Sequence, residues 1–286
     1  EGFVARLGGD EFAVLGEYGM EDAAKIAERI TRAMHKPFSL NGGIVTTRAS
    51  VGVTVGRAGA MDGRALMKQA DIALYEAKEE RAGMWRAFTR DLLRRRTERR
   101  RIENDLRQGL ANGDFWLAFQ PIFDIASGSV AGAEALVRWD HPQRGLVSPA
   151  DFIPVAEQSG LMPELGEWIL AAACSAAMRW PEEITLSVNI SPAQIQEPGF
   201  VDKALGILRA SGLPPRRLEV EITETALLAD ADKARKVIDR LKREGVRVAL
   251  DDFGTGYSSL SHIRQFPMDT VKIDRSFIGE FGSNNM

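Results

Sequence analysis

The predicted fold is decided by the stretch Val246-Arg247-Val248-Ala249-Leu250-Asp251-Asp252-Phe253-Gly254-Thr255-Gly256. Its first five residues have the apolar pattern of a buried strand, and two acids and a glycine-rich turn follow directly. Similar strands are predicted over residues 185–190, 218–222 and 270–273, with helical stretches over residues 201–210 and 231–244. Because buried strands that alternate with helices are typical of βα units, this part of the chain is predicted to form a parallel sheet, open or closed.

Each of these strands has a charged or metal-binding side chain at or near its C-terminal end. In chain order they are Asn189, Glu221, Asp251 with Asp252, and Lys272 with Asp274. In a closed βα barrel such ends meet on one face, where barrel enzymes place their catalytic groups. Carboxylates gathered there repel one another, and a divalent cation would relieve the repulsion. Any one of these acids could instead be a helix cap or a surface ion-pair partner, but the repetition favours a shared site.

The ligand types favour Mg²⁺ or Mn²⁺, because these cations prefer oxygen ligands. The three histidines, His35, His141 and His262, are scattered along the chain without a ligand spacing, which argues against zinc. The loop after Asp252 is predicted to bend tightly at its glycines while its serines bond to the backbone.

Residues 1–88 have a different pattern, with predicted strands at 12–15 and 45–53 and amphipathic helices at 21–36 and 64–80. This alternation indicates an α/β layer. A strongly charged segment then leads to Gly113, and Ile102, Leu106 and Leu110 form an apolar stripe on it, as expected of a connecting helix. Its arginines are interpreted as a solvated helix face, with nucleic-acid binding as the alternative.

The composition is that of an ordinary globular protein of about two domains. The 286 residues carry 37 Lys and Arg against 40 Asp and Glu, so a net charge of -3 offers no global attraction for nucleic acid or anionic lipid. No apolar stretch is long enough to cross a membrane. Cys174 cannot form an internal disulfide and is expected on a packed helix face. The first residue is not Met, and residues 282–286 form a polar tail soon after a strand-like segment, so we expect truncation to be possible at both ends.

Six segments accompany the loop from Asp251 to Leu260 in the order and at the spacing of one bacterial family. They are Phe119-Gln120-Pro121-Ile122, Glu134-Ala135-Leu136-Val137-Arg138-Trp139, Pro149-Ala150-Asp151-Phe152-Ile153-Pro154, Val188-Asn189-Ile190-Ser191, Glu221-Ile222-Thr223-Glu224 and Val271-Lys272-Ile273-Asp274. Together with the loop they resemble the EAL domains, bacterial phosphodiesterases of cyclic di-GMP.

Three segments near the N-terminus resemble a GGDEF domain, a relative of the nucleotidyl cyclases. They are Arg6-Leu7-Gly8-Gly9-Asp10-Glu11-Phe12, Ala49-Ser50-Val51-Gly52-Val53 and Ala70-Asp71-Ile72-Ala73-Leu74-Tyr75-Glu76-Ala77-Lys78. Alone, Gly8, Gly9, Asp10, Glu11 and Phe12 are equally compatible with a plain hairpin turn.

The two resemblances imply the fold class and the domains. Residues 1–88 would be the C-terminal part of a GGDEF domain, a partial nucleotidyl-cyclase-like α/β sandwich. Residues 89–113 would be the charged connecting helix, and residues 114–286 an EAL domain, an incomplete TIM-like (β/α) barrel that lacks its last βα units.

The resemblance also implies roles for individual residues. Two Mg²⁺ or Mn²⁺ ions would be held by Glu134, Asn189, Glu221, Asp251 and Asp252. Of these, Glu134 and Asp252 would act in catalysis together with Lys272, which would position or activate the water that attacks one phosphodiester. Gln120, Arg138 and Asp274 would bind substrate, and Glu224 would anchor the loop from Asp252 to Ser259. The implied product is linear pGpG.

The chain departs from both family patterns. A further strand-end Glu and a Gln-Gly pair follow Asp274 in EAL domains but not here, and the 172 residues from Phe115 to Met286 are fewer than the ~250 of a full barrel. We therefore expect phosphodiesterase activity in the intact parent and little in the 286 residues alone.

The GGDEF part lacks the first-strand Asp of its family. Gly2 stands where many relatives have an inhibitory-site Asp, and Ala82 stands where a phosphate-contacting Arg often lies. Residues 1–90 alone are therefore not expected to make cyclic di-GMP from GTP, and a regulatory role is favoured over a cyclase-like one, with GTP binding kept open.

The expected partners are cyclic di-GMP and, in the parent, a second copy of the chain, with no nucleic acid. The expected location is cytoplasmic, with any membrane anchor in segments upstream of Glu1. The alternative function is a catalytically inactive receptor that binds cyclic di-GMP or GTP without cleaving it.

Overall fold

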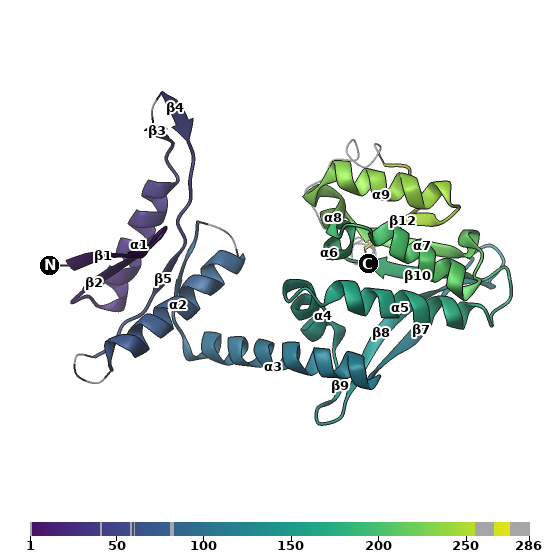
Figure 1. Ribbon diagram of the computed structural model, residues 1–286, viewed down its shortest axis with the longest axis horizontal. Coiled ribbons are helices and arrows are strands. Elements are labelled where there is room, and N and C mark those ends of the chain that lie inside the picture. The colour runs from purple at the N-terminus through teal and green to yellow at the C-terminus, as the bar shows by residue number, and fades with distance from the viewer. Residues whose placement is uncertain are drawn as a thin grey trace, which may run out of the picture. The chain divides into compact units, whose positions relative to one another are not determined.

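The computed structural model describes residues 2–40, 42–57, 59, 61–80, 83–254 and 266–274. The chain divides into two compact units, Glu1–Arg101 and Ile102–Met286 (Figure 1). Helix α3 (Arg90–Asn112) contributes residues to both units. Its apolar stripe is confirmed, since Ile102 and Leu106 are buried in the core of the second unit and Leu110 packs against it. No helix in these described ranges combines the length and apolarity that crossing a bilayer requires.

The first unit is built from short strands and two long helices. Its elements are β1 (Gly2–Gly8), β2 (Glu11–Gly16), α1 (Met20–Met34), β3 (Phe38–Leu40), β4 (Gly43–Val45), β5 (Val51–Val53), α2 (Gly63–Glu80) and β6 (Trp85–Ala87). β1 pairs with β2 and β3 with β4, both antiparallel, whereas β5 and β6 are parallel. Helix α2 packs on β5 at Gly52, where a side chain would overlap the backbone of Ala70 and Leu74.

The single strand predicted over residues 45–53 is wrong, because Val45 is the last residue of β4 and Val51–Val53 form a separate strand, β5. β4 pairs with β3 in a hairpin, while β5 pairs with β6. The residues between them, 46–50, have no regular structure. Two different partners require two separate stretches of extended backbone, which the apolar pattern of one segment does not reveal.

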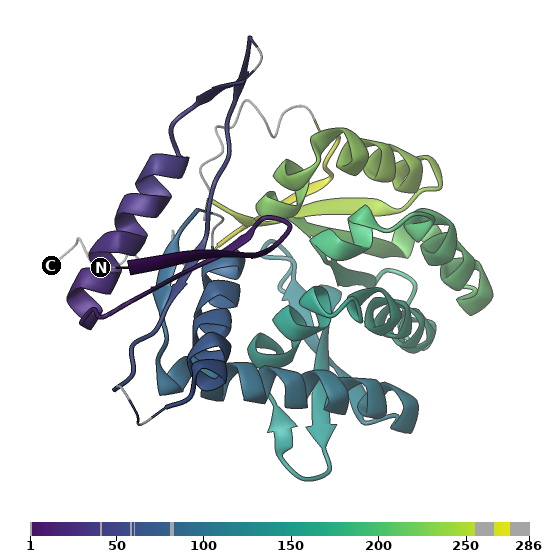
Figure 2. The same ribbon diagram turned by 60° about the vertical axis from the view of Figure 1, so that its left-hand side comes forward.

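The second unit is one sheet with helices packed on it (Figure 2). Its elements after α3 are β7 (Phe115–Phe123), β8 (Val130–His141), β9 (Gly145–Val147), α4 (Pro149–Gln158), α5 (Met162–Ala177), β10 (Thr185–Ile190), α6 (Pro192–Gln196), α7 (Phe200–Ser211), the 3₁₀ turn η1 (Pro215–Arg217), β11 (Leu218–Thr223), α8 (Glu224–Ala229), α9 (Ala231–Arg243), β12 (Arg247–Phe253) and β13 (Thr270–Ile273).

The strand order is β13-β12-β11-β10-β8-β7, with β9 paired to β8. The pairs that join β10, β11, β12 and β13 are parallel, as predicted, and the strands at 185–190 and 270–273 have the predicted bounds. β8, which was not predicted as a strand, is also parallel to β10. β7 and β9 run antiparallel to β8, which the sequence analysis did not predict. Mixed α/β architecture is thereby confirmed for the chain.

Alternation along the parallel strands separates an apolar face from a polar one. On β10, Leu186, Val188 and Ile190 are buried in the hydrophobic core, and β11 and β12 contribute their alternate apolar residues to the same core. The intervening residues of β10 are Ser187 and Asn189. The sheet therefore packs one face against helices and presents polar side chains on the other.

Two sequence interpretations concern helix surfaces. Cys174 is fully buried on α5, which confirms the packed helix face.

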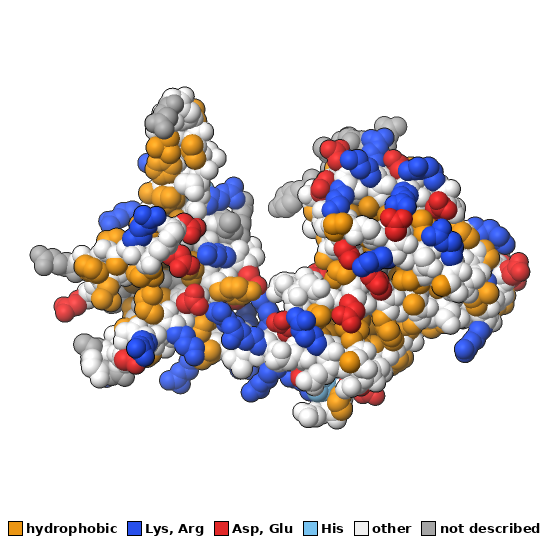
Figure 3. Space-filling model, viewed as in Figure 1, with side chains coloured by type: hydrophobic (Ala, Val, Ile, Leu, Met, Phe, Trp, Pro, Cys, Tyr) orange, Lys and Arg blue, Asp and Glu red, His pale blue; other side chains and the backbone are white. Residues whose placement is uncertain are grey.

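Most arginines of α3 have acidic partners within the first unit or along the helix, such as Arg96 with Asp71 and Arg99 with Glu79. Over α5, α7 and α9, Lys and Arg side chains are interspersed with Asp and Glu on the face drawn in Figure 3. This mixture is what a solvated surface presents.

Candidate active site

The polar face of the sheet gathers the predicted strand-end residues. Asn189 on β10 lies directly opposite Glu221 on β11 in the strand register. Glu134 on β8 pairs with Ser187 of β10, and Asp251 of β12 pairs with Thr223. Because parallel strands place their carboxyl ends at one edge, these side chains converge although more than a hundred residues separate the first from the last.

Lys272 on β13 is the common partner of the three acids Glu134, Glu221 and Asp251. Its Nζ donates to Glu134 Oε2 at 2.8 Å and to Glu221 Oε2 at 2.6 Å. Asp251 Oδ1 lies 3.7 Å from the same nitrogen. Asn189 Nδ2 in turn donates to the other oxygen of Glu134, at 2.7 Å. The five residues thus form one connected cluster in which a single ammonium faces three carboxylates.

Burial and charge set the protonation of this cluster. Glu221 is 1% exposed, and burial raises its pKa to about 7 although Lys272 acts in the opposite direction. Burial lowers the pKa of Lys272, but its hydrogen bonds to Glu134 and Glu221 outweigh that effect and leave this pKa above its ordinary value. Lys272 is therefore a firmly protonated cation at neutral pH.

Asp252 has the backbone conformation of a strained position. Its φ is +53°, the only positive φ among the described residues other than glycine. A side chain in this left-handed region costs conformational energy, and such strain collects at functional sites. Burial first, then the charges of Asp251 and Asp274, raise the pKa of Asp252. With this conformation Asp252 departs from the alternation of side chains between the two faces of β12. Its carboxylate is still repelled by the neighbouring acids.

The donor set fits a hard divalent cation. Glu221 Oε1 is buried and has no hydrogen-bond partner among the described residues, so this oxygen keeps its acceptor capacity while Oε2 accepts from Lys272. Glu134 and Asp251 add carboxylate oxygens, and the amide of Asn189 carries an oxygen as well as its NH₂ group. In the described ranges no three acidic, His or Cys side chains already stand in a metal-holding arrangement. Lys272 instead lies among the acids and supplies the balancing charge.

The predicted substrate-binding residues lie around this cluster. Gln120 of β7 is directly opposite Glu134 in the antiparallel pair, and it is exposed. Arg138 lies four residues after Glu134 on β8, hence on the same face, and its Nη1 donates to Val137 O at 2.9 Å. Asp274 follows β13, where its backbone N–H meets the carbonyl of Phe253 at 3.5 Å.

The predicted loop anchor Glu224 begins α8 and is 3% exposed. Thr223, just before it, caps the helix by accepting from the Ala226 N–H at 3.4 Å. The loop that Glu224 is predicted to hold runs from Asp252 to Ser259, and its residues from Thr255 onward lie outside the described residues. Ala82 and His262 lie outside them too.

In the first unit, residues Gly8 to Glu11 form the turn between β1 and β2. Gly9 has a φ of +52°, and its carbonyl accepts from the Arg6 guanidinium at 2.6 and 3.0 Å. Asp10 and Glu11 are exposed at this turn. The hairpin expected from the glycine pair is therefore present, with its two acids presented to solvent.

Two features of the site were not predicted from sequence. The first is Lys272 as the centre of the acid cluster rather than a peripheral residue. The second is a polar layer formed by Ser187, Glu219 and Thr270, each two residues before a predicted site residue. The period of two along a strand could have indicated this layer, since residues i and i+2 share a face.

Two known protein families match this chain, one for each unit. Residues 103–286 match the EAL domain family, and residues 1–84 match the family described as diguanylate cyclase, GGDEF domain. The chain belongs to the EAL domain family, with a GGDEF domain preceding the EAL domain.

Two relatives come from Pseudomonas aeruginosa. The bifunctional diguanylate cyclase/cyclic di-GMP phosphodiesterase MucR is 36% identical over 287 residues, which are 99% of this chain and 42% of MucR. The cyclic di-GMP phosphodiesterase NbdA is 38% identical over 280 residues, 96% of this chain and 36% of NbdA. The chain thus spans less than half the length of these relatives.

Solved structures agree with the family. The MucR phosphodiesterase in complex with c-di-GMP superposes with a TM-score of 0.61 at 38% identity, covering 64% of this chain and 76% of that one. The EAL domain of FimX from Pseudomonas aeruginosa, bound to c-di-GMP, gives 0.59 at 25% identity, covering 64% and 74%.

Proposed function

We propose that the EAL domain hydrolyses one phosphodiester bond of cyclic di-GMP and releases linear pGpG. The observation that carries this proposal is the convergence of Glu134, Asn189, Glu221 and Asp251 from four strands around Lys272. The names of MucR and NbdA, and the c-di-GMP in the MucR complex, support the choice of substrate.

We infer that Glu134, Asn189, Glu221, Asp251 and Asp252 hold Mg²⁺ or Mn²⁺, with two ions in the intact barrel. The unpartnered buried oxygen of Glu221 supports this assignment. When bound, a metal pair stabilises negative charge on the attacking and leaving oxygens of an in-line displacement.

The chain's own residues orient the reacting groups and neutralise negative charge. Lys272 donates from Nζ to Glu134 and Glu221, and these hydrogen bonds raise its pKa, which supports a role as a cation that positions water and phosphate. Asn189 fixes the second oxygen of Glu134 through its NH₂ group, which sets the direction of that carboxylate. Asp252, in its strained conformation, is the further acid available at the rim of the cluster.

Substrate would be held by the residues around the cluster. The guanidinium of Arg138 is a planar donor fork suited to a phosphate, and it projects from the face that carries Glu134. Gln120 lies beside Glu134 on the neighbouring strand, and Asp274 lies at the end of β13. Glu224 would anchor the loop that begins at Asp252.

The GGDEF domain is proposed to regulate this activity or to act as a diguanylate cyclase. Its support is the family match and the exposed Asp10 and Glu11 at the β1–β2 turn. GTP binding there and dimerisation of the intact protein stay predictions, as do the domain bounds 1–88, 89–113 and 114–286.

The test is hydrolysis of cyclic di-GMP by the intact protein that contains these residues, with Mn²⁺ or Mg²⁺, followed by chromatography of pGpG. Glu134→Ala should bring turnover below detection, because it removes an acid that contacts both Lys272 and Asn189. Glu182→Ala is the control, since Glu182 is an exposed glutamate of the same domain.

Two outcomes would contradict the phosphodiesterase mechanism. Full turnover of Glu134→Ala would show that the cluster is not the site, and undiminished turnover in excess chelator would exclude the metal. Tight binding of cyclic di-GMP by the unmodified protein without any pGpG would instead support the alternative, an inactive receptor.

A further inference from the structure

Glu219 is a buried carboxylate that the proposed reaction does not use. It lies on β11 two residues before Glu221, and it is 7% exposed. An ionisable side chain is seldom buried unless it is bonded, because loss of hydration penalises its charged form. Glu219 therefore needs partners within the fold, and the partners identify what it does.

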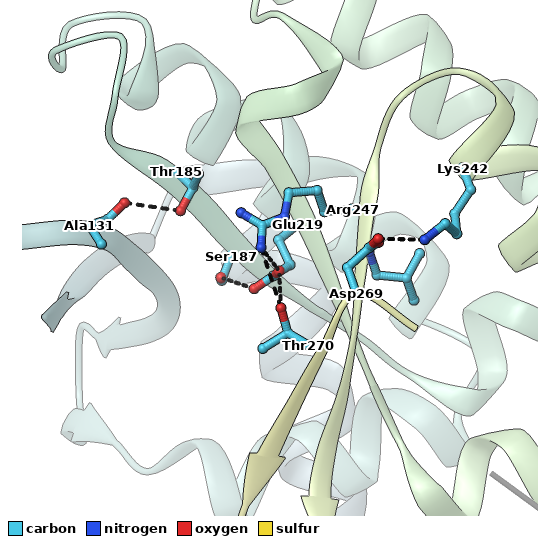
Figure 4. A network of polar contacts seen from close by, with 9 residues as sticks. Ala131, Thr185, Ser187, Glu219, Lys242, Arg247, Asp269 and Thr270 are labelled. Carbon is cyan, nitrogen blue, oxygen red and sulfur yellow. Dashed lines mark hydrogen bonds and ion pairs between the residues drawn. The ribbon is translucent and has the colours of Figure 1, made fainter. Parts of the chain in front are cut away.

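Three side chains from three other strands meet Glu219 (Figure 4). Thr270 of β13 donates its hydroxyl to Oε2 at 2.8 Å, and Ser187 of β10 lies 3.4 Å from Oε1. The guanidinium of Arg247, on β12, lies 3.5 Å from Oε2. One carboxylate thus links the four strands β10 to β13 on the polar face of the sheet.

This layer lies directly beneath the candidate active site. Ser187, Glu219 and Thr270 each precede, by two residues on the same strand, a member of the upper cluster: Asn189, Glu221 and Lys272. Two residues along a strand span roughly 6.6 Å and return to the same face of the sheet. The position of Thr270 against Glu219 therefore determines where Lys272 lies against Glu221.

β13 is the strand that most needs such a constraint. It has four residues, and its pairing with β12 is irregular between Leu250 and Phe253. A slip of one residue would turn Lys272 to the opposite face and remove the ammonium from the acids. At its start, Asp269 accepts from the Val248 N–H at 2.8 Å and pairs with Lys242, so the strand has a second anchor there.

We infer that Glu219 is a positioning residue for the reaction: by binding Thr270 it fixes the register of β13 and thereby holds Lys272 between Glu134 and Glu221. The inference rests on the proposed phosphodiesterase function for its catalytic consequence. The contact between Glu219 and Thr270 is itself independent of that function.

The first experiment uses Thr270→Val, which removes the hydroxyl and keeps the branched shape. In the intact protein, kcat for cyclic di-GMP hydrolysis should fall about 10- to 100-fold, the usual cost of losing a partner behind a site residue, while KM changes less than about threefold. Thr270→Ser restores the hydroxyl and should recover most of kcat. Thr185→Val is the matched control, because Thr185 donates to Ala131 O on the same sheet but does not touch Glu219.

The second experiment measures how firmly β13 is held, independently of turnover. Hydrogen exchange of the backbone amides of Val271 to Ile273 should accelerate about tenfold in Thr270→Val and in Glu219→Leu, but not in Thr185→Val. Glu219→Leu removes both acceptor oxygens, and it leaves no buried charge without a partner, because the Arg247 side chain is 45% exposed to water. A variant that lost kcat through general unfolding would also accelerate exchange in the other strands.

The outcomes separate the two proposals. If the unmodified protein cleaves cyclic di-GMP but Thr270→Val and Glu219→Leu retain its kcat, the positioning role is wrong. If the unmodified protein shows no hydrolysis, the proposed function fails, and unchanged amide exchange in both variants would then overturn the register role as well. Faster exchange confined to β13, with kcat lost in both variants and recovered by serine, is the result we expect.

Discussion

Arg217 shows how one residue can stabilise a junction that no motif identifies. Its side chain is 4% exposed, and its guanidinium donates to the carbonyls of Ala177, Pro181 and Ile184 at 3.0–3.1 Å. The carbonyls at the end of a helix lack intrahelical partners, and a cation there also complements the helix dipole. Arg217 thereby joins the end of α5 and the following loop to the start of β11.

Arg217→Met should lower the free energy of unfolding of the EAL domain by about 3 kcal/mol or more. It removes the charged donor from three carbonyls, of which that of Ala177 is buried and those of Pro181 and Ile184 are partly buried. Hydrogen bonds to charged groups contribute about 1.5–3 kcal/mol each. The neighbouring Arg216 is mostly exposed, so Arg216→Met should change stability by less than about 0.5 kcal/mol. Urea titrations followed by tryptophan fluorescence measure both, and equal effects would contradict the assignment.

The thiol of Cys174 should be unreactive in the folded chain. Burial raises its pKa from 9.0 to about 11, so at pH 8 the reactive thiolate is about 100-fold rarer than in the unfolded chain. An aromatic disulfide reagent at pH 8 should therefore modify Cys174 at least about 100-fold more slowly in buffer than in concentrated urea. Similar rates in the two conditions would show that α5 does not bury this residue.

At the scale of elements, two helix-interior glycines differ in their surroundings. Relative to alanine, each lowers the intrinsic stability of its helix by the same amount. A side-chain carbon at Gly206 of α7 would meet nothing within 4 Å. At Gly166 of α5 it would overlap the side chain of Gln194, which is 3% exposed. Gln194 forms a capping box with Ser191 at the start of α6, so Gly166 provides the space for that cap.

The two glycines should therefore respond in opposite directions to alanine. Gly206→Ala should raise the free energy of unfolding by about 0.5–1 kcal/mol through helix propensity alone. Gly166→Ala should lower it by about 1–3 kcal/mol, because overpacking displaces Gln194 from its cap. Chemical denaturation of the two variants and of the unmodified protein measures these changes in the free energy of unfolding. Stabilisation by both substitutions would mean that α5 and α6 are not packed through Gly166.

At the scale of the whole molecule, the fold gathers acids from several strands around one ammonium at the site. Glu134, Glu221, Asp251 and Asp252 surround the single ammonium of Lys272, and when all four acids are ionised the formal charge is −4 + 1 = −3. Repulsion among them opposes folding of the sheet. A ligand that binds only the folded chain shifts the folding equilibrium by mass action.

Mn²⁺ or Mg²⁺ should therefore stabilise the intact protein, by about 2.7 kcal/mol when free metal exceeds its Kd a hundredfold. Thermal unfolding with metal and with excess chelator measures the shift in Tm. Glu221→Gln should lose most of this metal-dependent shift, whatever its own Tm without metal. A Tm that does not respond to either cation in the unmodified protein would contradict the metal assignment.

Sequence periodicity and local motifs determined much of this protein. Four strands of the parallel sheet, β10 to β13, could be placed from their apolar runs, and the polar residues at their ends could be placed with them, because both depend on neighbours within a few residues. β8 could not be placed in this way. The turn from Gly8 to Glu11 and the burial of Cys174 follow from local pattern in the same way.

Tertiary structure alone decided which of these pieces meet. The bond between Lys272 and Glu134 joins residues 138 positions apart, and the antiparallel placement of β7, the division between β4 and β5, and the burial of Arg217 all depend on strand order. Local sequence fixes the face on which a side chain lies, since the strand period is two. It cannot fix which strand lies alongside, because that depends on packing of the whole sheet against its helices.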